Sequence, residues 1–341
     1  THTAATTAQA HKKMSNASNT NLSQFLAQGH CQNIPRKAFR DYDMTKQMTS
    51  GRYAQIWAAK DASSGEDVVI KVSNFEENTR NEFDCLSRLV DVPHVMQLKG
   101  CCVNGSSNTL GFVLEKAETD LMELVERRGP LDEKTALKYF RDICHGLTHC
   151  HNRKIAHLDL KPENILVSSD DRAIIADFEL SYNWGPSNNP ITDLRVGTVY
   201  YAAPEVNGCR ESYVAKKADI WSLGVLLYVL VSGTWPFRGA TYQQIEANAR
   251  AANLYFSRTD YSPELNNLLR KLLSVDPNNR PSVEQILLHP WLQGRKLEDP
   301  LPIHSSASRH LFRLPLSSIR PTCCFSPLPH DLGLLSPQSP A

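Results

Sequence analysis

The sequence lacks a hydrophobic run long enough to span a bilayer. Its longest apolar stretch, residues 220–231, is interrupted by Ser222 and Gly224 and is shorter than the roughly 20 residues that a transmembrane helix needs. No signal-peptide pattern is visible. We therefore predict no membrane span and expect an intracellular protein of the cytoplasm or nucleus.

The sequence also lacks an excess of charge of either sign. Lys and Arg number 37 against 36 Asp and Glu, which gives a formal net charge of +1. Such a balance provides no overall field that would attract nucleic acid or an anionic membrane. We therefore expect neither among the partners of this chain.

Cysteine spacing typical of a metal site is absent. The nine cysteines include the vicinal pairs Cys101–Cys102 and Cys323–Cys324, but no pair has the C-x-x-C and His spacing of a zinc site. An odd number of scattered cysteines is typical of reduced thiols in an intracellular protein.

Both ends of the chain lack a sustained hydrophobic period. Residues 1–40 are rich in Thr, Ala, Asn, Ser and Gln, and residues 293–341 are rich in Pro and Ser, so we predict that both segments are disordered. Residues 309–320 give only a short, proline-broken basic stretch, which does not support calmodulin binding. Residues 41–292 remain, which is enough for one large domain or two lobes.

One stretch of this central region combines residues suited to a single chemistry. Residues 155–167 read IAHLDLKPENILV, and residues 174–179 read IIADFE. Asp159 can accept a proton from a hydroxyl, and Lys161 can neutralise a transferring phosphoryl group. Asn164 and Asp177 offer hard oxygen ligands for Mg²⁺. The combination indicates phosphoryl transfer from a nucleotide.

These residues resemble the catalytic and magnesium loops of the eukaryotic protein kinases, and the other kinase motifs follow in order from about Asp41 to Leu292. The resemblance implies an α+β, bilobal kinase fold. A small lobe, residues 41–117, would hold a five-stranded antiparallel sheet and one helix. A larger, mainly helical lobe would cover residues 118–292.

The resemblance also implies ATP and Mg²⁺ as cofactors. Lys71 matches the strand lysine that contacts the α- and β-phosphates, and Glu82 matches its carboxylate partner on the adjoining helix. Glu82 shares a helix face with apolar residues, where a carboxylate needs a cation. The other residues that the resemblance places around the nucleotide are Gly51, Ile56, Val69, Leu114, Glu115, Ala117 and Leu166.

Two further motifs resemble the Ser/Thr type of protein kinase. One is Lys161 within D-L-K-P-E-N, and the other is residues 197–205, which match G-T-x-x-Y-x-A-P-E. The resemblance implies that Thr198 hydrogen-bonds near Asp159, that Glu205 pairs with Arg280, and that Asp219 anchors the catalytic loop. Residues 219–292 are most similar to the calcium/calmodulin-dependent kinase group.

The chain departs from the kinase pattern at three places. Leu158 replaces the arginine of H-R-D, Glu179 replaces the glycine of D-F-G, and the phosphate loop keeps only Gly51, since Thr49 and Ala54 replace the outer glycines. A loop with one glycine should hold ATP less closely and weaken activity.

The retained charged groups nevertheless favour an active Ser/Thr kinase acting on protein substrates, because such catalysis depends on positioning and electrostatics. The alternative is a pseudokinase, an interaction scaffold with weak or no nucleotide turnover. The resemblance implies that the arginine of H-R-D receives a phosphorylated residue of the segment after Asp177. Because Leu158 offers no such cation, we expect phosphorylation of Ser181, Ser187 and Thr192 to be dispensable. The sequence specifies no oligomeric state.

Overall fold

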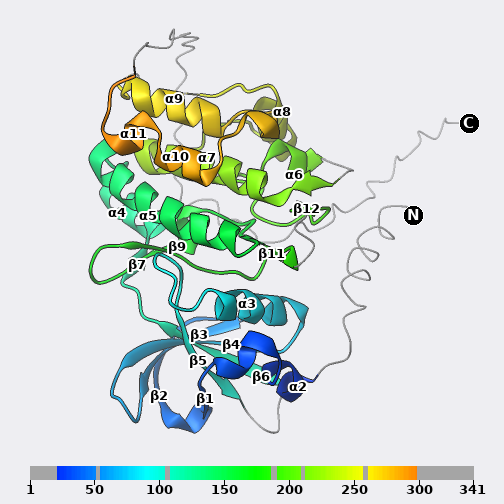
Figure 1. Cartoon of the computed structure of the whole chain (residues 1–341). Coiled ribbons are helices and arrows are strands. Elements are labelled where there is room, and N and C mark those ends of the chain that lie inside the picture. Colours follow the sequence, from blue (N-terminus) through cyan, green and yellow to red (C-terminus); the bar gives the residue numbers. More distant parts are fainter. Residues whose placement is uncertain are drawn as a thin grey trace, which may run out of the picture.

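The structure is a computed structural model that describes residues 21–50, 54–103, 108–185, 190–208, 212–255 and 260–297. It consists of a small lobe built around one sheet and a larger, mainly helical lobe (Figure 1). The α+β, bilobal fold expected from the sequence is confirmed.

The sheet of the small lobe has the strand order β1-β5-β6-β4-β3-β2. Its antiparallel part consists of β2 (Tyr42–Ser50), β3 (Ala54–Asp61), β4 (Asp67–Asn74), β5 (Leu98–Val103) and β6 (Thr109–Glu115). These are the five expected strands, although the fourth, expected from the sequence at residues 95–98, begins only at Leu98 as β5. β1 (Arg36–Ala38) adds a sixth strand that pairs parallel to β5. Along β4, Val68 and Ile70 are buried on one face, and Lys71 lies on the other.

Residues 21–40 fold, so the expectation of disorder from residue 1 to residue 40 is wrong for this part. They form α2 (Leu22–Leu26), a 3-10 helix (Gly29–Asn33) and β1, and a second 3-10 helix (Phe39–Asp41) follows. Phe25 is buried, with its ring 5.3 Å from that of Phe75 and 5.9 Å from that of Phe83. Phe83 belongs to α3 (Glu77–Arg88), so the segment packs on the helix that carries Glu82.

The larger lobe is organised around α7 (Ala215–Ser232), which is buried on all sides from Ala218 to Ser232. The other helices are α4 (Leu121–Arg128), α5 (Glu133–Asn152), α6 (Pro204–Gly208), α8 (Tyr242–Arg250), α9 (Pro263–Leu272), α10 (Val283–Leu287) and α11 (Pro290–Gln293). Residues 293–297, expected to begin a disordered tail, continue this lobe, because the N–H of Leu297 donates to Glu264 at 3.1 Å. Residues 1–20 and 298–341 lie outside the described residues.

Short strands follow the sheet of the small lobe along the described part of the chain. They are β7 (Thr119–Asp120), β8 (Ile155–Ala156), β9 (Ile165–Val167), β10 (Ala173–Ile175), β11 (Tyr182–Asn183), β12 (Ile191–Thr192) and β13 (Tyr213–Val214). β9 pairs with both β7 and β10, β8 pairs with β11, and β12 pairs with β13. These pairings fix the loops that carry the predicted site residues.

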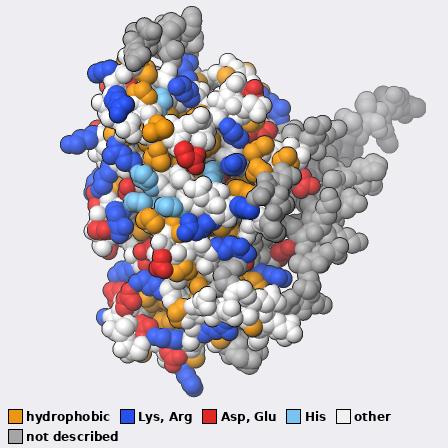
Figure 2. Space-filling model, viewed as in Figure 1, with side chains coloured by type: hydrophobic (Ala, Val, Ile, Leu, Met, Phe, Trp, Pro, Cys, Tyr) orange, Lys and Arg blue, Asp and Glu red, His pale blue; other side chains and the backbone are white. Residues whose placement is uncertain are grey.

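The surface carries interspersed charges of both signs on the face shown in Figure 2. Among the described residues, no helix is long and apolar enough to cross a membrane. The six cysteines of the described segments are buried free thiols, namely Cys31, Cys85, Cys101, Cys102, Cys144 and Cys150.

Candidate active site

Asp159 lies at the centre of a dense hydrogen-bond network and is 4% exposed. Thr198 Oγ1 donates to Asp159 Oδ1 at 2.8 Å. Lys161 Nζ donates to Asp159 Oδ2 at 2.8 Å and to Thr198 Oγ1 at 2.9 Å. Asn164 Nδ2 donates to Asp159 Oδ2 at 3.0 Å and to its carbonyl oxygen at 2.9 Å. The structure thus brings together four predicted catalytic residues and fixes both carboxylate oxygens of Asp159.

The backbone before Asp159 is anchored from α7. Asp219, which is fully buried, accepts hydrogen bonds from the N–H groups of His157 at 3.0 Å and Leu158 at 2.8 Å. His151 Nε2 lies 2.8 Å from the same carboxylate. Leu158 has a positive φ of 63°, which is unusual for a side chain branched at Cγ. The hydrogen bonds to Asp219 stabilise this backbone conformation.

Gly197 is required by the close approach of the segment that carries Thr198. Its φ is +102°, and a Cβ there would lie 2.5 Å from the carbonyl oxygen of Leu158. Only glycine combines this backbone conformation with so close a contact. The glycine therefore allows Thr198 to reach Asp159.

His157 is a site residue that the sequence analysis missed. It is fully buried, with Nε2 2.9 Å from the carbonyl oxygen of Ala176 and with Nδ1 accepting from the N–H of Asp159 at 3.2 Å. Its ring also meets that of Phe178 edge-on at 4.9 Å. His157 therefore joins the loop of Asp159 to the loop of Asp177. Its place two residues before Asp159 could have indicated this role.

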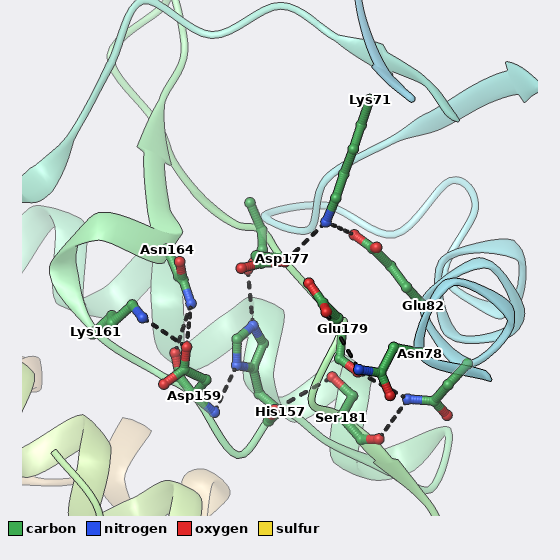
Figure 3. A network of polar contacts seen from close by, with 12 residues as sticks. Lys71, Asn78, Glu82, His157, Asp159, Lys161, Asn164, Asp177, Glu179 and Ser181 are labelled. Atoms are coloured by element: carbon green, nitrogen blue, oxygen red, sulfur yellow. Dashed lines mark hydrogen bonds and ion pairs between the residues drawn. The ribbon is translucent and has the colours of Figure 1, made fainter. Parts of the chain in front are cut away.

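Lys71 connects the small lobe to the loop of Asp177 (Figure 3). Its Nζ lies 2.8 Å from Glu82 Oε1 and 3.1 Å from Asp177 Oδ1. Burial alone would lower the pKa of Lys71, but Glu82 and Asp177 outweigh it and raise the pKa. Lys71 therefore remains a cation at neutral pH.

The two carboxylates beside Lys71 differ in the direction of their pKa shifts. Burial raises the pKa of Glu82 to about 7, although Lys71 opposes the shift. Burial would also raise the pKa of Asp177, but Lys71 outweighs burial and holds that pKa below its usual range. The Asp177 side chain is 39% exposed, in contrast to 4% for Glu82. Asp177 is therefore the carboxylate of the two that has the lower pKa and the greater exposure.

Asn164 and Asp177 fit the oxygen donor set that Mg²⁺ prefers. Both hydrogen bonds of the Asn164 amide use Nδ2, and Figure 3 shows its Oδ1 pointing away from Asp159. The amide oxygen and the Asp177 carboxylate are hard ligands on neighbouring loops. These two residues could hold the metal that the sequence predicts.

The predicted adenine-binding residues come from both lobes. Val69 on β4 is paired with Leu114 on β6, Ile56 lies on β3, and Leu166 lies on β9 of the larger lobe. All but the buried Leu114 are partly exposed. They are therefore accessible to a ligand between the lobes.

The linker between the lobes is held by Gln97. Glu115 Oε1 accepts from the N–H of Gln97 at 3.0 Å, and the N–H of Glu115 donates to the Gln97 carbonyl at 3.2 Å. The N–H of Ala117 has no acceptor within the described residues, so it could donate to a ligand. Gly51 lies outside the described residues.

Glu205 and Arg280 form the expected structural ion pair. Arg280 Nη1 and Nη2 donate to the two carboxylate oxygens of Glu205 at 2.6 and 2.8 Å. The guanidinium is buried, and it also donates to the carbonyl oxygens of Ser274, Lys217 and Val275. This bidentate contact fixes the end of the segment that carries Thr198.

The two unusual loop residues have different surroundings. Leu158 is 7% exposed and belongs to an apolar cluster with Trp184 and Tyr201. Glu179 is half-buried, and its Oε1 accepts from Asn78 Nδ2 at 3.4 Å. A buried apolar side chain thus takes the place of a cation, whereas the extra carboxylate faces α3.

Comparison with known families matches the protein kinase domain over residues 42–292. The chain is 33% identical over 277 residues to "CBL-interacting protein kinase 26" of Oryza sativa subsp. japonica, an alignment that covers 79% of this chain and 54% of that protein. It is 32% identical over 290 residues to "CBL-interacting serine/threonine-protein kinase 5" of Arabidopsis thaliana, with 80% and 64% covered.

A further relative is "CBL-interacting serine/threonine-protein kinase 20" of Arabidopsis thaliana, 32% identical over 274 residues, with 76% of this chain and 61% of the relative covered. The chain therefore spans a little over half of the length of these relatives. The resemblance of the catalytic loop, the magnesium loop and the surrounding motifs to Ser/Thr protein kinases is confirmed. The chain belongs to the eukaryotic protein kinase family.

Proposed function

We propose that this chain is a serine/threonine protein kinase that transfers the γ-phosphate of Mg-ATP to hydroxyl groups of intracellular proteins. The observation that supports this most strongly is the network around Asp159. Thr198, Lys161 and Asn164 all bond its carboxylate at 2.8 to 3.0 Å. A carboxylate held in this way is ready to accept a proton from a substrate hydroxyl.

Each charged residue has a distinct role in the proposed reaction. Asp159 orients the hydroxyl and takes its proton, and Lys161 stabilises negative charge on the transferring group. Lys71, kept protonated beside Glu82, binds phosphate oxygens of the nucleotide. Asn164 and Asp177 would hold Mg²⁺, which supplies positive charge to the phosphates.

The nucleotide would lie between Val69 and Leu166, with its adenine at the linker. Val69 and Leu166 come from different lobes and offer apolar surfaces. The N–H of Ala117, which has no acceptor in the described part of the chain, would donate to the base. This arrangement orients the phosphates toward Lys71.

A scaffold without turnover is the second candidate. It is favoured by two replacements, Leu158 for the arginine of H-R-D and Glu179 for the glycine of D-F-G. Neither residue interrupts the contacts of Asp159 or the Lys71–Glu82 pair. Because the electrostatic groups of transfer remain assembled, we propose the enzyme in preference to the scaffold.

The test is transfer of labelled γ-phosphate from Mg-ATP to a mixture of Ser- and Thr-containing peptides. We expect Asp159→Asn to reduce transfer by at least about a hundredfold, in line with the loss of one preorganised electrostatic group. Asp170→Asn is the control, since Asp170 is exposed and its partners among the described residues are its neighbours Arg172 and Ser168. Equal transfer by the wild type and Asp159→Asn would refute the proposed role. No transfer and no shift of the melting temperature by Mg-ATP would favour the scaffold.

A further inference from the structure

A row of polar side chains on α3 faces the segment that follows Asp177. Asn78, Asn81 and Asp84 recur every three residues and so lie on one side of the helix. Their contacts join Asn78 to Glu179, Asn81 to the carbonyls of Glu179 and Ser181, and Asp84 to Asn183. We call these six residues the α3 latch, and Figure 3 shows Asn78 beside Glu179.

The central contact of the latch is the one made by Asn81. Its Nδ2 lies 2.7 Å from the carbonyl oxygen of Ser181 and 3.5 Å from that of Glu179. Asn183 Nδ2 adds a bond of 3.1 Å to Asp84 Oδ2, whereas the contact of Asn78 with Glu179 is longer, at 3.4 Å. The shortest of these contacts is thus made by Asn81, the residue that directly precedes Glu82 in α3.

The latched segment is itself fixed to the catalytic loop. β11 (Tyr182–Asn183) pairs with β8 (Ile155–Ala156), which directly precedes His157. Ser181 Oγ donates to the carbonyl oxygen of His157 at 3.3 Å. Any movement of α3 that separates Glu82 from Lys71 must therefore also break contacts to a segment held by the catalytic loop.

Two hydroxyls of this segment, those of Ser181 and Thr192, are poorly placed to carry a phosphate, whereas Ser187 lies outside the described residues. Leu158 offers no cation, and Ser181 and Thr192 are 4% and 6% exposed. The hydroxyl of Ser181 donates to the backbone, and that of Thr192 accepts from the N–H of Leu194 at 3.2 Å. Both hydroxyls already have structural partners, and a modifying enzyme has little access to them.

We propose that the α3 latch positions Glu82, and through it Lys71, so that the kinase acts without phosphorylation of Ser181 or Thr192. Asn81 is the principal positioning residue. The inference rests on the proposed transfer activity for its kinetic consequence, although the latch itself is a structural feature that can be tested without turnover.

The experiment compares Asn81→Ala with Asn266→Ala in phosphatase-treated full-length protein. Both asparagines lie in helices, are part-buried and donate to backbone carbonyls, but Asn266 belongs to α9 and bonds Tyr261 and Ser262. We expect Asn81→Ala to lower kcat/KM for Mg-ATP about fivefold or more and Asn266→Ala to change it less than twofold. In the background of Glu82→Gln, Asn81→Ala should have less than a twofold further effect, because it acts through Glu82.

Hydrogen–deuterium exchange provides a readout that does not depend on turnover. Asn81→Ala should accelerate amide exchange in α3 and in residues 179–183, and Asn266→Ala should not. Unchanged exchange in Asn81→Ala would overturn the latch, whether or not the wild type transfers phosphate. If the wild type is active, retention of full kcat/KM by Asn81→Ala, or a loss beyond tenfold on phosphatase treatment of the wild type, would overturn the proposal while leaving the proposed function intact.

Discussion

Asp219→Ala should destabilise the protein strongly, because one buried carboxylate satisfies two backbone donors of the catalytic loop. Asp219 accepts the N–H groups of His157 at 3.0 Å and Leu158 at 2.8 Å, and all three residues are buried. Each buried donor left without a partner costs about 1–3 kcal/mol. Two such donors predict a loss of about 2–6 kcal/mol in the free energy of unfolding.

The assay is urea unfolding followed by circular dichroism, with the free energy extrapolated to zero urea. Asp170→Ala is the control, since its carboxylate is exposed and should leave the midpoint close to that of the wild type. Transfer activity should also fall in Asp219→Ala at temperatures where the variant remains folded. Asp159 directly follows Leu158 in the chain, so its position depends on the backbone that Asp219 holds. A loss of stability no greater than that of the control would refute the reasoning that Asp219 anchors the loop.

Three further predictions follow from buried residues around the site. Phe25→Ala should lower the free energy of unfolding by about 3–5 kcal/mol in urea titrations, since the ring is 4% exposed against α3; a change below 1 kcal/mol, on the order of a surface substitution, would contradict the packing. Leu158→Arg should lower the melting temperature, because it places an unpaired cation in an apolar cluster, and an unchanged melting temperature would argue against that burial. Burial raises the pKa of Glu82 to about 7, so protonation of Glu82 stabilises the folded state fully below the ordinary pKa near 4.5, and this stabilisation is lost as the pH rises through 7. The free energy of unfolding of the wild type should therefore fall relative to that of Glu82→Gln between pH 5 and 8, roughly the window of the shift. The opposite sign would refute the shift.

The sequence indicated that Asp159, Lys161 and Asn164 lie together because their spacing is local. Asp159, Lys161 and Asn164 lie within six residues of one another, so one loop carries all three side chains. The Lys71–Glu82 pair was also predicted, since a carboxylate on an apolar helix face needs a cation.

Residues 21–40 were predicted wrongly because their composition is polar and their few apolar residues show no long period. Leu22, Phe25 and Leu26 are buried only because α3 and the sheet provide a surface for them. Burial of this kind depends on tertiary contacts, which override the local pattern. The sixth strand was missed for the same reason, since β1 has only three residues and pairs with the distant β5.

The α3 latch could have been only partly anticipated. The three-residue spacing of Asn78, Asn81 and Asp84 is visible in the sequence, but their partners lie about a hundred residues away. Polar residues on a helix face are usually solvated, so their spacing alone predicts no contact. The partners became evident only with the pairing of β8 and β11.

The most direct test of the central claim is identification of the residues that receive label from γ-labelled Mg-ATP. The wild-type chain should label serine and threonine in protein substrates. Asp159→Asn, which keeps the side-chain shape but removes the charge bonded by Lys161 and Thr198, should label neither. Absence of label with the wild type, or equal label with both proteins, would contradict the account.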